Sequence, residues 1–418
     1  MGLMGSVSKA QNGTWTVYST YTSDIGGNNI SALATDNKGV WVGTYLGLCR
    51  LNGASWMDYA MFNEKLKDQS VNCLMVDKRG VLWVGTDDYG VIEFDGTHWT
   101  EYATETRRLK MKFIKEIVQD NDGVFWIGVT LGGVVRFDGY SWEKYTPDDS
   151  ELLSDFVLDL AVDRANRKWI TTNAGVSVFN DRRWVNYTVQ NCGLPDDIVP
   201  AIAIDGHNTK WFGTLNGLCS FDGEEWHTWN TSNSPLPSNQ INDIAIDDEG
   251  LLWIATSGGA AVFDGVDRWV VFTSKNSPLP AGNIYKVAND KKGNHWFGND
   301  SKGLARLTGF KMPAKAAAPE VAQQTEPETK PAGSPVESKK SDEKVRINPH
   351  LSDGYITLSI ESKMATVTFT NSSGKVVKTV NNYKSGQKIA INRMPKGMYT
   401  VGVRTERGER KIKFNLKK

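Results

Sequence analysis

The stretch INDIAIDDEGLLWIATSGGAAVFDGVDRWVVF, residues 241–272, decides the fold. It contains four short apolar runs with strand-like alternation, each closed by the Gly, Asp or Asn residues that form tight turns. Four strands joined by three tight turns predict one small antiparallel sheet.

The same pattern occurs seven times along the chain. The tryptophan of the second predicted strand returns every 42 or 43 residues, at Trp41, Trp83, Trp126, Trp169, Trp211, Trp253 and Trp296. An aspartate ends each first strand, at Asp36, Asp77, Asp120, Asp163, Asp205, Asp247 and Asp290. A period of about 40–45 residues with four strands per unit is typical of propeller blades. The sequence therefore predicts an all-β fold, with a seven-bladed β-propeller over residues 11–310.

The seventh copy lacks a fourth strand, and the chain supplies one at its other end. The pattern stops after Gly309, whereas residues 12–18 read NGTWTVY, like a fourth strand. Each fourth-strand Trp precedes the next first strand by 15 residues, and Trp15 precedes Ile30 by the same interval. The N-terminal strand is therefore predicted to complete the last blade and close the ring, which leaves no open edge there.

The remaining segments differ from the repeat in composition. Residues 1–10 end in a small-residue pattern and look like the remnant of a secretory signal peptide, with an ordinary N-terminus as the alternative. Residues 311–341 are rich in Pro, Ala, Glu and Lys and lack apolar periodicity, so they predict a disordered linker. Residues 342–418 alternate in short runs and predict a small β-sandwich.

Charge and composition exclude several kinds of function. Residues 1–310 carry 27 Lys and Arg against 38 Asp and Glu, whereas residues 342–418 carry 16 against 6. An acidic propeller is a poor partner for nucleic acid, because that binding depends on neutralising phosphates. There is no run of 18 apolar residues, so no transmembrane helix is expected. The four cysteines lack metal-like spacing, and neither a metal nor another cofactor is predicted.

The repeat reads h-x-x-h-x-x-D, G-x-h-W-h-G-T, G-h-x-x-F-D-G and W-x-x-Y, where h is apolar. Leu-Pro pairs before three first strands, at Leu194, Leu236 and Leu279, belong to the same pattern. Over residues 11–310 this pattern resembles the two-component-regulator propeller repeat, which builds periplasmic sensor portions of bacterial hybrid kinases. The resemblance implies the fold. These 418 residues contain no membrane span, kinase or receiver segment, so a sensor-kinase role does not transfer.

A second set of motifs lies near the C-terminus. It comprises NP and SDG between Asn348 and Gly354, VTFTNSSGKVVK from Val367, MPKGMY ending at Tyr399, and a basic end from Arg410. These motifs resemble the type IX secretion sorting domain of Bacteroidetes. The resemblance implies that type IX secretion machinery recognises residues 342–418, and that the protein is secreted or displayed on the outer membrane of a Gram-negative bacterium. A β-sandwich that only binds a ligand is the alternative. The residues predicted to carry the sorting signal are Gly374, Gly397, Tyr399, Lys411 and Lys413.

The loops of the first three copies differ from the rest. Connections from second to third strand and from fourth to first strand share one face of a propeller, and later copies use Ser-Pro-Leu-Pro there. An aromatic and charged cluster in one sector favours a non-catalytic binding module for a protein or a glycan. Ordinary solvated loop residues are the alternative. The predicted ligand-binding residues are Tyr45, Asp87, Asp88, Tyr89, Arg107, Arg108 and Lys110.

Four charged residues at first-strand positions are predicted to line the central channel: Glu116, Asp159, Asp243 and Lys286. Paired carboxylates are able to perform acid–base chemistry, so an extracellular lyase or glycan hydrolase is the second hypothesis. A bound ion or a contact with Lys286 explains the carboxylates equally well, and a structural stalk or adhesin component is the third hypothesis. No G-x-S-x-G, H-E-x-x-H or phosphate-loop motif is present, and the five histidines lack ligand-like spacing.

Overall fold

The computed structural model describes residues 6–10, 13–102, 112–313, 346–348, 355–359, 365–371, 376–383, 388–390, 397–405 and 408–416. The chain divides into two compact units, Met1–Glu320 and Val321–Lys418. Both consist of strands, and the described residues contain one short 3-10 helix, η1 (Glu64–Leu66). The predicted all-β class is confirmed.

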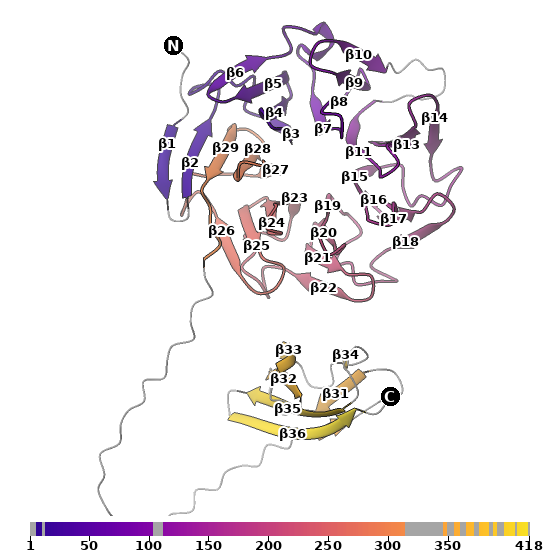
Figure 1. Cartoon of the computed structure of the whole chain (residues 1–418), viewed down its shortest axis with the longest axis vertical. Helices are drawn as coiled ribbons and strands as arrows, with labels where there is room; N and C mark the ends of the chain where they lie inside the picture. The colour runs from indigo at the N-terminus through magenta and orange to yellow at the C-terminus, as the bar shows by residue number, and fades with distance from the viewer. Residues whose placement is uncertain are drawn as a thin grey trace, which may run out of the picture. The chain divides into compact units, whose positions relative to one another are not determined.

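Repeated antiparallel sheets of four consecutive strands build the first unit, as the sequence predicts (Figure 1). The first three are β3 (Ile30–Thr35), β4 (Gly39–Thr44), β5 (Gly47–Asn52), β6 (Ser55–Asp58); β7 (Val71–Val76), β8 (Leu82–Thr86), β9 (Val91–Phe94), β10 (Trp99–Tyr102); and β11 (Ile114–Gln119), β12 (Phe125–Val129), β13 (Gly133–Phe137), β14 (Trp142–Tyr145). The next three are β15 (Val157–Val162), β16 (Lys168–Thr172), β17 (Gly175–Phe179), β18 (Trp184–Tyr187); β19 (Ala201–Ile204), β20 (Lys210–Thr214), β21 (Gly217–Phe221), β22 (Trp226–Trp229); and β23 (Ile241–Ile246), β24 (Leu252–Thr256), β25 (Gly259–Phe263), β26 (Trp269–Phe272).

A five-stranded sheet combines strands from both ends of this unit. Its order is β1-β2-β29-β28-β27, with β1 (Ser6–Ala10), β2 (Gly13–Tyr18), β27 (Ile284–Asn289), β28 (Asn294–Asn299) and β29 (Leu304–Thr308). Strand β2 pairs antiparallel with β29 and places Trp15 opposite Leu307. Strand β1 lies within the segment predicted to be a signal-peptide remnant, and it forms a hairpin with β2.

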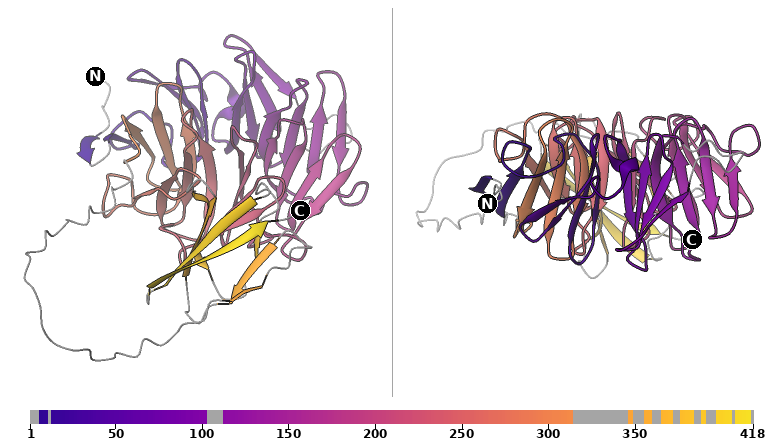
Figure 2. Two further views of the ribbon diagram at one scale, coloured as in Figure 1. Left: turned by 60° about the horizontal axis from the view of Figure 1, so that its bottom comes forward. Right: turned by 90° about the horizontal axis from the view of Figure 1, so that it is seen from above.

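Contacts join this five-stranded sheet to the sheet that begins at β3. The Thr35 hydroxyl donates a hydrogen bond to the Asn289 carbonyl at 2.9 Å. A Cβ atom placed on Gly298 would lie 2.6 Å from Ile30 Cγ2, so only glycine allows the two sheets to approach this closely. The sheets surround a central axis, and the first unit is a disc that Figure 2 shows from its edge.

The first strands carry a β-bulge at a shared position. The register shifts just before Ala32, Cys73, Glu116, Asp159, Asp243 and Lys286. A bulge bends its strand and re-aims a side chain. All six of these residues line one central cavity, so the bulge is the local device that directs them toward the axis.

The core of the first unit lies between neighbouring sheets. Each second-strand Trp is buried, and in two cases a ring near the start of the second strand of the next sheet stacks on it. Phe125 stacks on Trp83 with ring centroids 4.0 Å apart, and His295 stacks on Trp253 at 3.6 Å. These contacts explain why the Trp recurs at one position in every copy.

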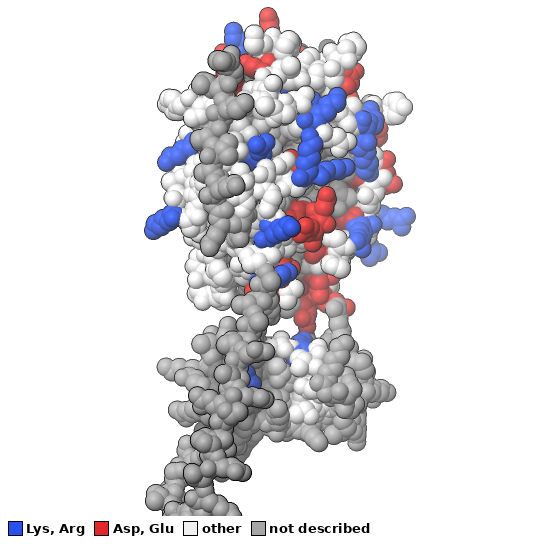
Figure 3. Space-filling view, turned by 60° about the vertical axis from the view of Figure 1, so that its left-hand side comes forward, with Lys and Arg blue, Asp and Glu red and all other residues white. Residues whose placement is uncertain are grey.

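The charged surface of the first unit is mixed in sign. On the side that comes forward in Figure 3, Lys and Arg side chains lie beside Asp and Glu, and most of the described surface is uncharged. Nucleic-acid binding requires a concentrated positive surface. The described residues on this side do not form one.

The second unit contains two antiparallel sheets. One is β30 (Arg346–Asn348), β31 (Tyr355–Ser359) and β34 (Lys388–Ala390); the other has the order β33 (Val376–Tyr383), β32 (Ala365–Asn371), β35 (Gly397–Thr405) and β36 (Gly408–Leu416). Alternate residues of β32 and β35, including Val367, Phe369 and Val401, form its apolar core with Ile389 of β34. This is the alternation expected of strands with one buried face.

Candidate functional site

The four predicted channel residues come together. Glu116, Asp159, Asp243 and Lys286 line a central cavity of about 230 Å³, to which seven first strands contribute. The Nζ atom of Lys286 lies 3.9 Å from Asp243 Oδ1. The described residues contain no group of three or more His, Cys, Asp and Glu side chains placed to hold a metal ion.

The two channel aspartates connect neighbouring sheets. Asp159 accepts the N–H of Leu160 at 2.7 Å with one carboxylate oxygen and the N–H of Ile202, in the next sheet, at 2.8 Å with the other. Asp243 makes the equivalent pair of bonds, at 3.1 Å to its own strand and 2.9 Å to the following sheet. Both oxygens of each carboxylate therefore satisfy backbone groups, which is a structural role.

Electrostatics in the cavity are strongly perturbed. Burial raises the pKa of Glu116 and, together with the Glu116 charge, raises the pKa of Asp159 well above its usual range. Burial alone lowers the pKa of Lys286, but the three carboxylates outweigh it and raise that pKa. Lys286 therefore carries the positive charge that balances the acidic cavity.

One face of the first unit, here called the turn face, carries the turns between first and second strands. The Asp that ends each first strand accepts a hydrogen bond from the indole N–H of the second-strand Trp in the same sheet. The seven distances, in chain order from Asp36–Trp41 to Asp290–Trp296, are 3.1, 3.3, 3.0, 3.1, 3.0, 2.7 and 3.1 Å. The two most regular signals of the repeat are thus partners in one hydrogen bond.

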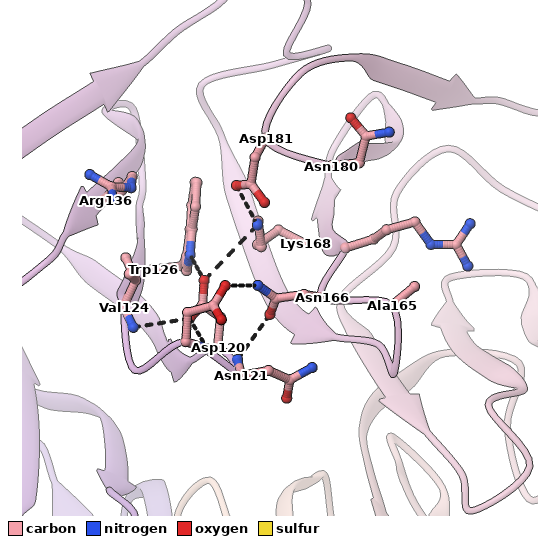
Figure 4. A network of polar contacts seen from close by, with 12 residues as sticks. Asp120, Asn121, Val124, Trp126, Arg136, Ala165, Asn166, Lys168, Asn180 and Asp181 are labelled. Carbon is pink, nitrogen blue, oxygen red and sulfur yellow. Dashed lines mark hydrogen bonds and ion pairs between the residues drawn. The ribbon is translucent and has the colours of Figure 1, made fainter.

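Figure 4 shows this arrangement where two sheets meet. The Asp120 carboxylate accepts the Val124 N–H at 2.9 Å and the Trp126 indole N–H at 3.0 Å. Lys168, buried in the next sheet, lies 2.5 Å from Asp181 and 4.0 Å from Asp120. Its Nζ stands 4.8 Å from the centre of the Trp126 ring, so this lysine packs between sheets.

The opposite face, here called the loop face, carries the second-to-third and fourth-to-first connections. In the first three sheets these connections expose large apolar side chains, namely Tyr45, Leu46, Met61, Phe62, Tyr89, Phe113 and Leu131. The equivalent turn of the sheet β23–β26 has Ser257, and that of β27–β29 has Asp300. Tyr21, Val189, Ile198 and Leu215 are exposed on the same kinds of connection elsewhere, so most, but not all, of the exposed apolar side chains of the loop face lie in one sector.

Two pockets that share lining residues occur in this sector. The larger, about 500 Å³, is lined by Tyr45, Asp68, Gln69, Ser70, Asn72, Asp87 and Asp88. The smaller, about 180 Å³, shares Tyr45, Asn72 and Asp87 with it and adds Phe113, Lys115 and Tyr285. Residues from several sheets therefore build one continuous candidate site.

Hydrogen bonds fix the polar floor of the larger pocket. The Ser70 hydroxyl donates to Asn72 Oδ1 at 2.8 Å, and Asn72 Nδ2 donates to Asp87 Oδ1 at 2.5 Å. In the smaller pocket the Lys115 ammonium donates to the Tyr285 hydroxyl at 3.0 Å. Burial raises the pKa of Tyr285, but Lys115 and Lys286 outweigh it and bring that pKa below its usual value.

The predicted ligand-binding residues divide into three groups. Tyr45, Asp87 and Asp88 line the larger pocket, and Asp88 lies 3.1 Å from Lys112. Tyr89 is outside the pocket lining, with Lys65 Nζ 5.8 Å from its ring centre. The third group, Arg107, Arg108 and Lys110, lies outside the described residues.

Four residues of the two pockets, Ser70, Asn72, Lys115 and Tyr285, were not predicted from the sequence. Three of them occupy one position, immediately before a channel residue, where the bulge breaks the strand alternation. Across the copies this position holds Ser31, Asn72, Lys115, Leu158, Pro200, Asn242 and Tyr285. That variation between otherwise similar copies is the signal that points to them.

The predicted sorting residues are only partly described. Tyr399 is buried in the core of the second unit, and Gly397 begins β35. Lys411 and Lys413 belong to β36, and Gly374 lies outside the described residues. No helix in the described parts of the chain is long and apolar enough to cross a membrane.

Comparison with known families agrees with both motif sets. Residues 347–417 match the secretion system C-terminal sorting domain, and residues 65–88 and 235–258 match the two component regulator propeller. No curated protein matches the sequence.

Solved structures similar to this one include the following three. The extracellular domain of a hybrid two-component system from B. thetaiotaomicron has a TM-score of 0.63 at 19% identity, and the match covers 96% of this chain and 57% of that one. PorZ, a surface component of the type IX secretion system of Porphyromonas gingivalis, has a TM-score of 0.58 at 16% identity, over 97% and 63%. Virginiamycin B lyase from Staphylococcus aureus has a TM-score of 0.58 at 13% identity, over 70% and 98%.

These likenesses show the fold alone, and the chain spans less than two thirds of the first two structures. The family matches add the repeat type and the export signal. The chain therefore carries two component regulator propeller repeats and a C-terminal type IX sorting domain, and it is secreted or exposed at the cell surface.

Proposed function

We propose that the first unit is a closed, seven-bladed propeller that acts outside the cell as a non-catalytic binding module for a protein or a glycan. The observation that carries this proposal is the concentration of pockets and exposed apolar side chains in one sector of the loop face. Monomeric proteins rarely expose a contiguous apolar surface without a use for it.

Closure of the ring supports this role because it provides a rigid platform. Strand β2 pairs with β29, and Thr35 and Asn289 are hydrogen-bonded across the junction of the two sheets. Loops held by a rigid scaffold are the usual place for binding residues in such folds.

The second hypothesis, an extracellular lyase or glycan hydrolase, has one observation in its favour. The raised pKa values of Glu116 and Asp159 are of the kind found in general acids. Against it, both carboxylate oxygens of Asp159 and of Asp243 accept backbone N–H groups. Incubating the full chain and a Glu116→Gln variant with polysaccharides separates the hypotheses, because turnover lost in the variant favours an enzyme.

Export depends on the second unit in this proposal. The sorting domain implies interaction with the type IX secretion machinery, and we assign recognition to Gly374, Gly397, Tyr399, Lys411 and Lys413. A reporter fused to residues 342–418 is expected to reach the surface of a type IX-competent host. A Lys411→Glu/Lys413→Glu fusion is expected to remain in the periplasm, and equal export of both fusions would remove these lysines from the signal.

Binding itself is tested with glycan and peptide arrays. The full chain is compared with a loop-face variant, Tyr45→Ala/Asp87→Asn, and with a control, Asp248→Asn/Tyr140→Ala, which changes the same residue types in exposed turns of the turn face. We expect a ligand that binds wild type and the control but not the loop-face variant. Equal binding by all three proteins would refute the proposed function.

A further inference from the structure

We propose that the larger loop-face pocket binds the cationic side chain of an arginine or lysine within an apolar segment of a partner protein. This inference rests on the proposed binding function and specifies its ligand. Three features of the pocket point to this ligand: its hydrogen-bonding capacity, its charge and its rim.

The pocket offers more hydrogen-bond acceptors than donors. Gln69 Oε1 is buried, and no described donor reaches it. Asp87 Oδ1 receives the Asn72 amide, whereas no hydrogen bond to Asp87 Oδ2 is formed by the described residues. Asp87 Oδ2 is therefore a free acceptor in the lining of the pocket, and a ligand rich in N–H groups is its natural complement.

Charge favours the same ligand. Three carboxylates, Asp68, Asp87 and Asp88, line the pocket, and of these Asp88 lies 3.1 Å from Lys112. Within the described chain, Asp68 and Asp87 have no cationic partner. Lys65 forms an ion pair with Glu101 instead. A guanidinium group satisfies both needs because it carries five N–H donors and a permanent positive charge.

An aromatic ring stands at the pocket wall. Tyr45 is 55% exposed and lines both pockets, so about half of its surface is open to solvent or a ligand. Cations bind over tyrosine rings, and arginine does so most often. Tyr45 therefore supports a cation that reaches toward Asp87.

The rim indicates a protein rather than a glycan. Met61 and Phe62 are among the most exposed apolar side chains of the unit, and Leu46 and Leu131 are also exposed. A Cβ atom on Gly47 would lie 2.7 Å from the Leu66 carbonyl, which shows that the β4–β5 turn packs against the segment carrying Met61 and Phe62. Aromatic residues and Met are enriched in protein interfaces, and aliphatic rims suit apolar peptide side chains.

Two exposed rim residues are held in an unusual backbone conformation. Phe113 has φ of 56° and Leu131 has φ of 59°, in the left-handed region that bulky side chains rarely adopt. The N–H of Phe113 donates to the Asp87 carbonyl at 2.8 Å, and the Phe113 carbonyl accepts the N–H of Thr130 at 3.1 Å. These bonds tie the backbone of Phe113 and Thr130, which line the smaller pocket, to Asp87, which lines both pockets.

The test uses two synthetic pentapeptides, Ac-Ala-Leu-Arg-Phe-Ala-NH2 and the same sequence with citrulline in place of arginine. Citrulline keeps the shape of the side chain and removes its charge. Binding to the full chain is measured by calorimetry at low and at high salt. We expect the arginine peptide to bind at least tenfold more tightly, and we expect salt to reduce that ratio.

Variants locate the effect. Asp87→Asn keeps an oxygen that accepts the Asn72 amide, so it preserves the floor of the pocket while removing the charge. We expect it to bring the arginine-to-citrulline ratio close to one, whereas Asp248→Asn leaves the ratio unchanged. Equal binding of both peptides by wild type, or an unchanged ratio in Asp87→Asn, would overturn the inference.

The glycan array distinguishes this failure from failure of the proposed function. If a glycan binds wild type but not Tyr45→Ala/Asp87→Asn, and the peptides do not bind, then the loop face is a binding site and the cationic ligand is wrong. If neither ligand class responds to the loop-face variant, both proposals fall.

Discussion

The turn face and the loop face of the first unit are made by the same repeat, yet they differ in what varies. On the turn face every sheet has the same Asp–Trp hydrogen bond, within 2.7 to 3.3 Å. On the loop face the corresponding turns contain Tyr45, Tyr89 and Leu131 in the first three sheets but Ser257 in a later one. Residues that are the same in every sheet therefore stabilise the fold, whereas residues that differ between sheets are available for binding.

The largest expected loss of stability comes from opening the ring of sheets. Removing residues 1–18 eliminates β2 and the fully buried Trp15, which packs against Phe272 and Phe297. Loss of a buried Trp alone costs about 3–5 kcal/mol, so we expect the free energy of unfolding to fall by at least about 5 kcal/mol. Urea denaturation of the full chain measures this, with removal of residues 1–5 as the control. A truncated chain that unfolds at the wild-type midpoint would show that β2 does not close the propeller.

A smaller but still large loss is expected on the turn face. Asp120→Ala leaves the N–H groups of Asp122 and Val124 and the Trp126 indole without their acceptor. Unsatisfied buried donors cost about 1–3 kcal/mol each, so a destabilisation of about 3–4 kcal/mol is expected. Asp248 is an exposed residue in the turn between β23 and β24, so Asp248→Ala is expected to change the free energy of unfolding by no more than about 0.5 kcal/mol. Similar unfolding curves for the two variants would mean that the Asp–Trp bonds do not stabilise the turn face.

Low pH is expected to lower the free energy of unfolding through His295, which lies near the turn face. Burial lowers the pKa of His295, which stacks on Trp253, to about 4. An unfolded His titrates near about 6.5, so the unfolded chain binds the proton first and stability falls as pH drops from about 6.5 to 4. The loss reaches about 3 kcal/mol. His295→Phe places there the residue type that Phe125 provides beside Trp83. Urea titrations across this pH range should show a flatter profile for the variant; parallel profiles would exclude His295 as the cause.

The sequence predicts the regular part of this molecule well because its signals are periodic. The spacing of Trp41 to Trp296 identifies the sheets, and the 15-residue interval after Trp15 identifies the partner of β29. It also identifies Glu116, Asp159, Asp243 and Lys286 as neighbours, because they share one position in successive first strands. Periodicity does not predict the hydrogen bond between the Asp that ends each first strand and the Trp of the second strand, because in the sequence these two residues look like independent features.

The candidate site is harder to predict for a physical reason. Asn72 and Lys115 reach the loop-face pockets through β-bulges, and a bulge interrupts the alternation by which inward and outward side chains are recognised. Gln69 and Ser70 precede a strand in a connection of ordinary composition. Tyr45 was predictable because it replaces residues of a different type at equivalent turns, whereas Asp87 was predictable only from the aromatic and charged cluster around it, since Asp300 occupies the equivalent turn of β27–β29.

The smallest stability effect is expected on the loop face. Tyr45→Ala and Phe113→Ala remove side chains that are about half exposed and lie outside the core, so each should change the free energy of unfolding by no more than about 0.5 kcal/mol. Tyr45→Ala is nevertheless expected to weaken arginine-peptide binding at least tenfold. Parallel denaturation and calorimetry on each variant show whether stability and binding separate. A destabilisation comparable with that of Asp120→Ala would mean that the loop face is structural as well.

Hydrogen–deuterium exchange of the full chain, with and without saturating Ac-Ala-Leu-Arg-Phe-Ala-NH2, tests the division between the two faces most directly. The account predicts slower exchange in residues 68–72, 87–89 and 113–115 on the loop face, and unchanged exchange in the turns at 121–123 and 164–166. Protection at those turns, or an exchange pattern that the peptide does not alter at all, would contradict it.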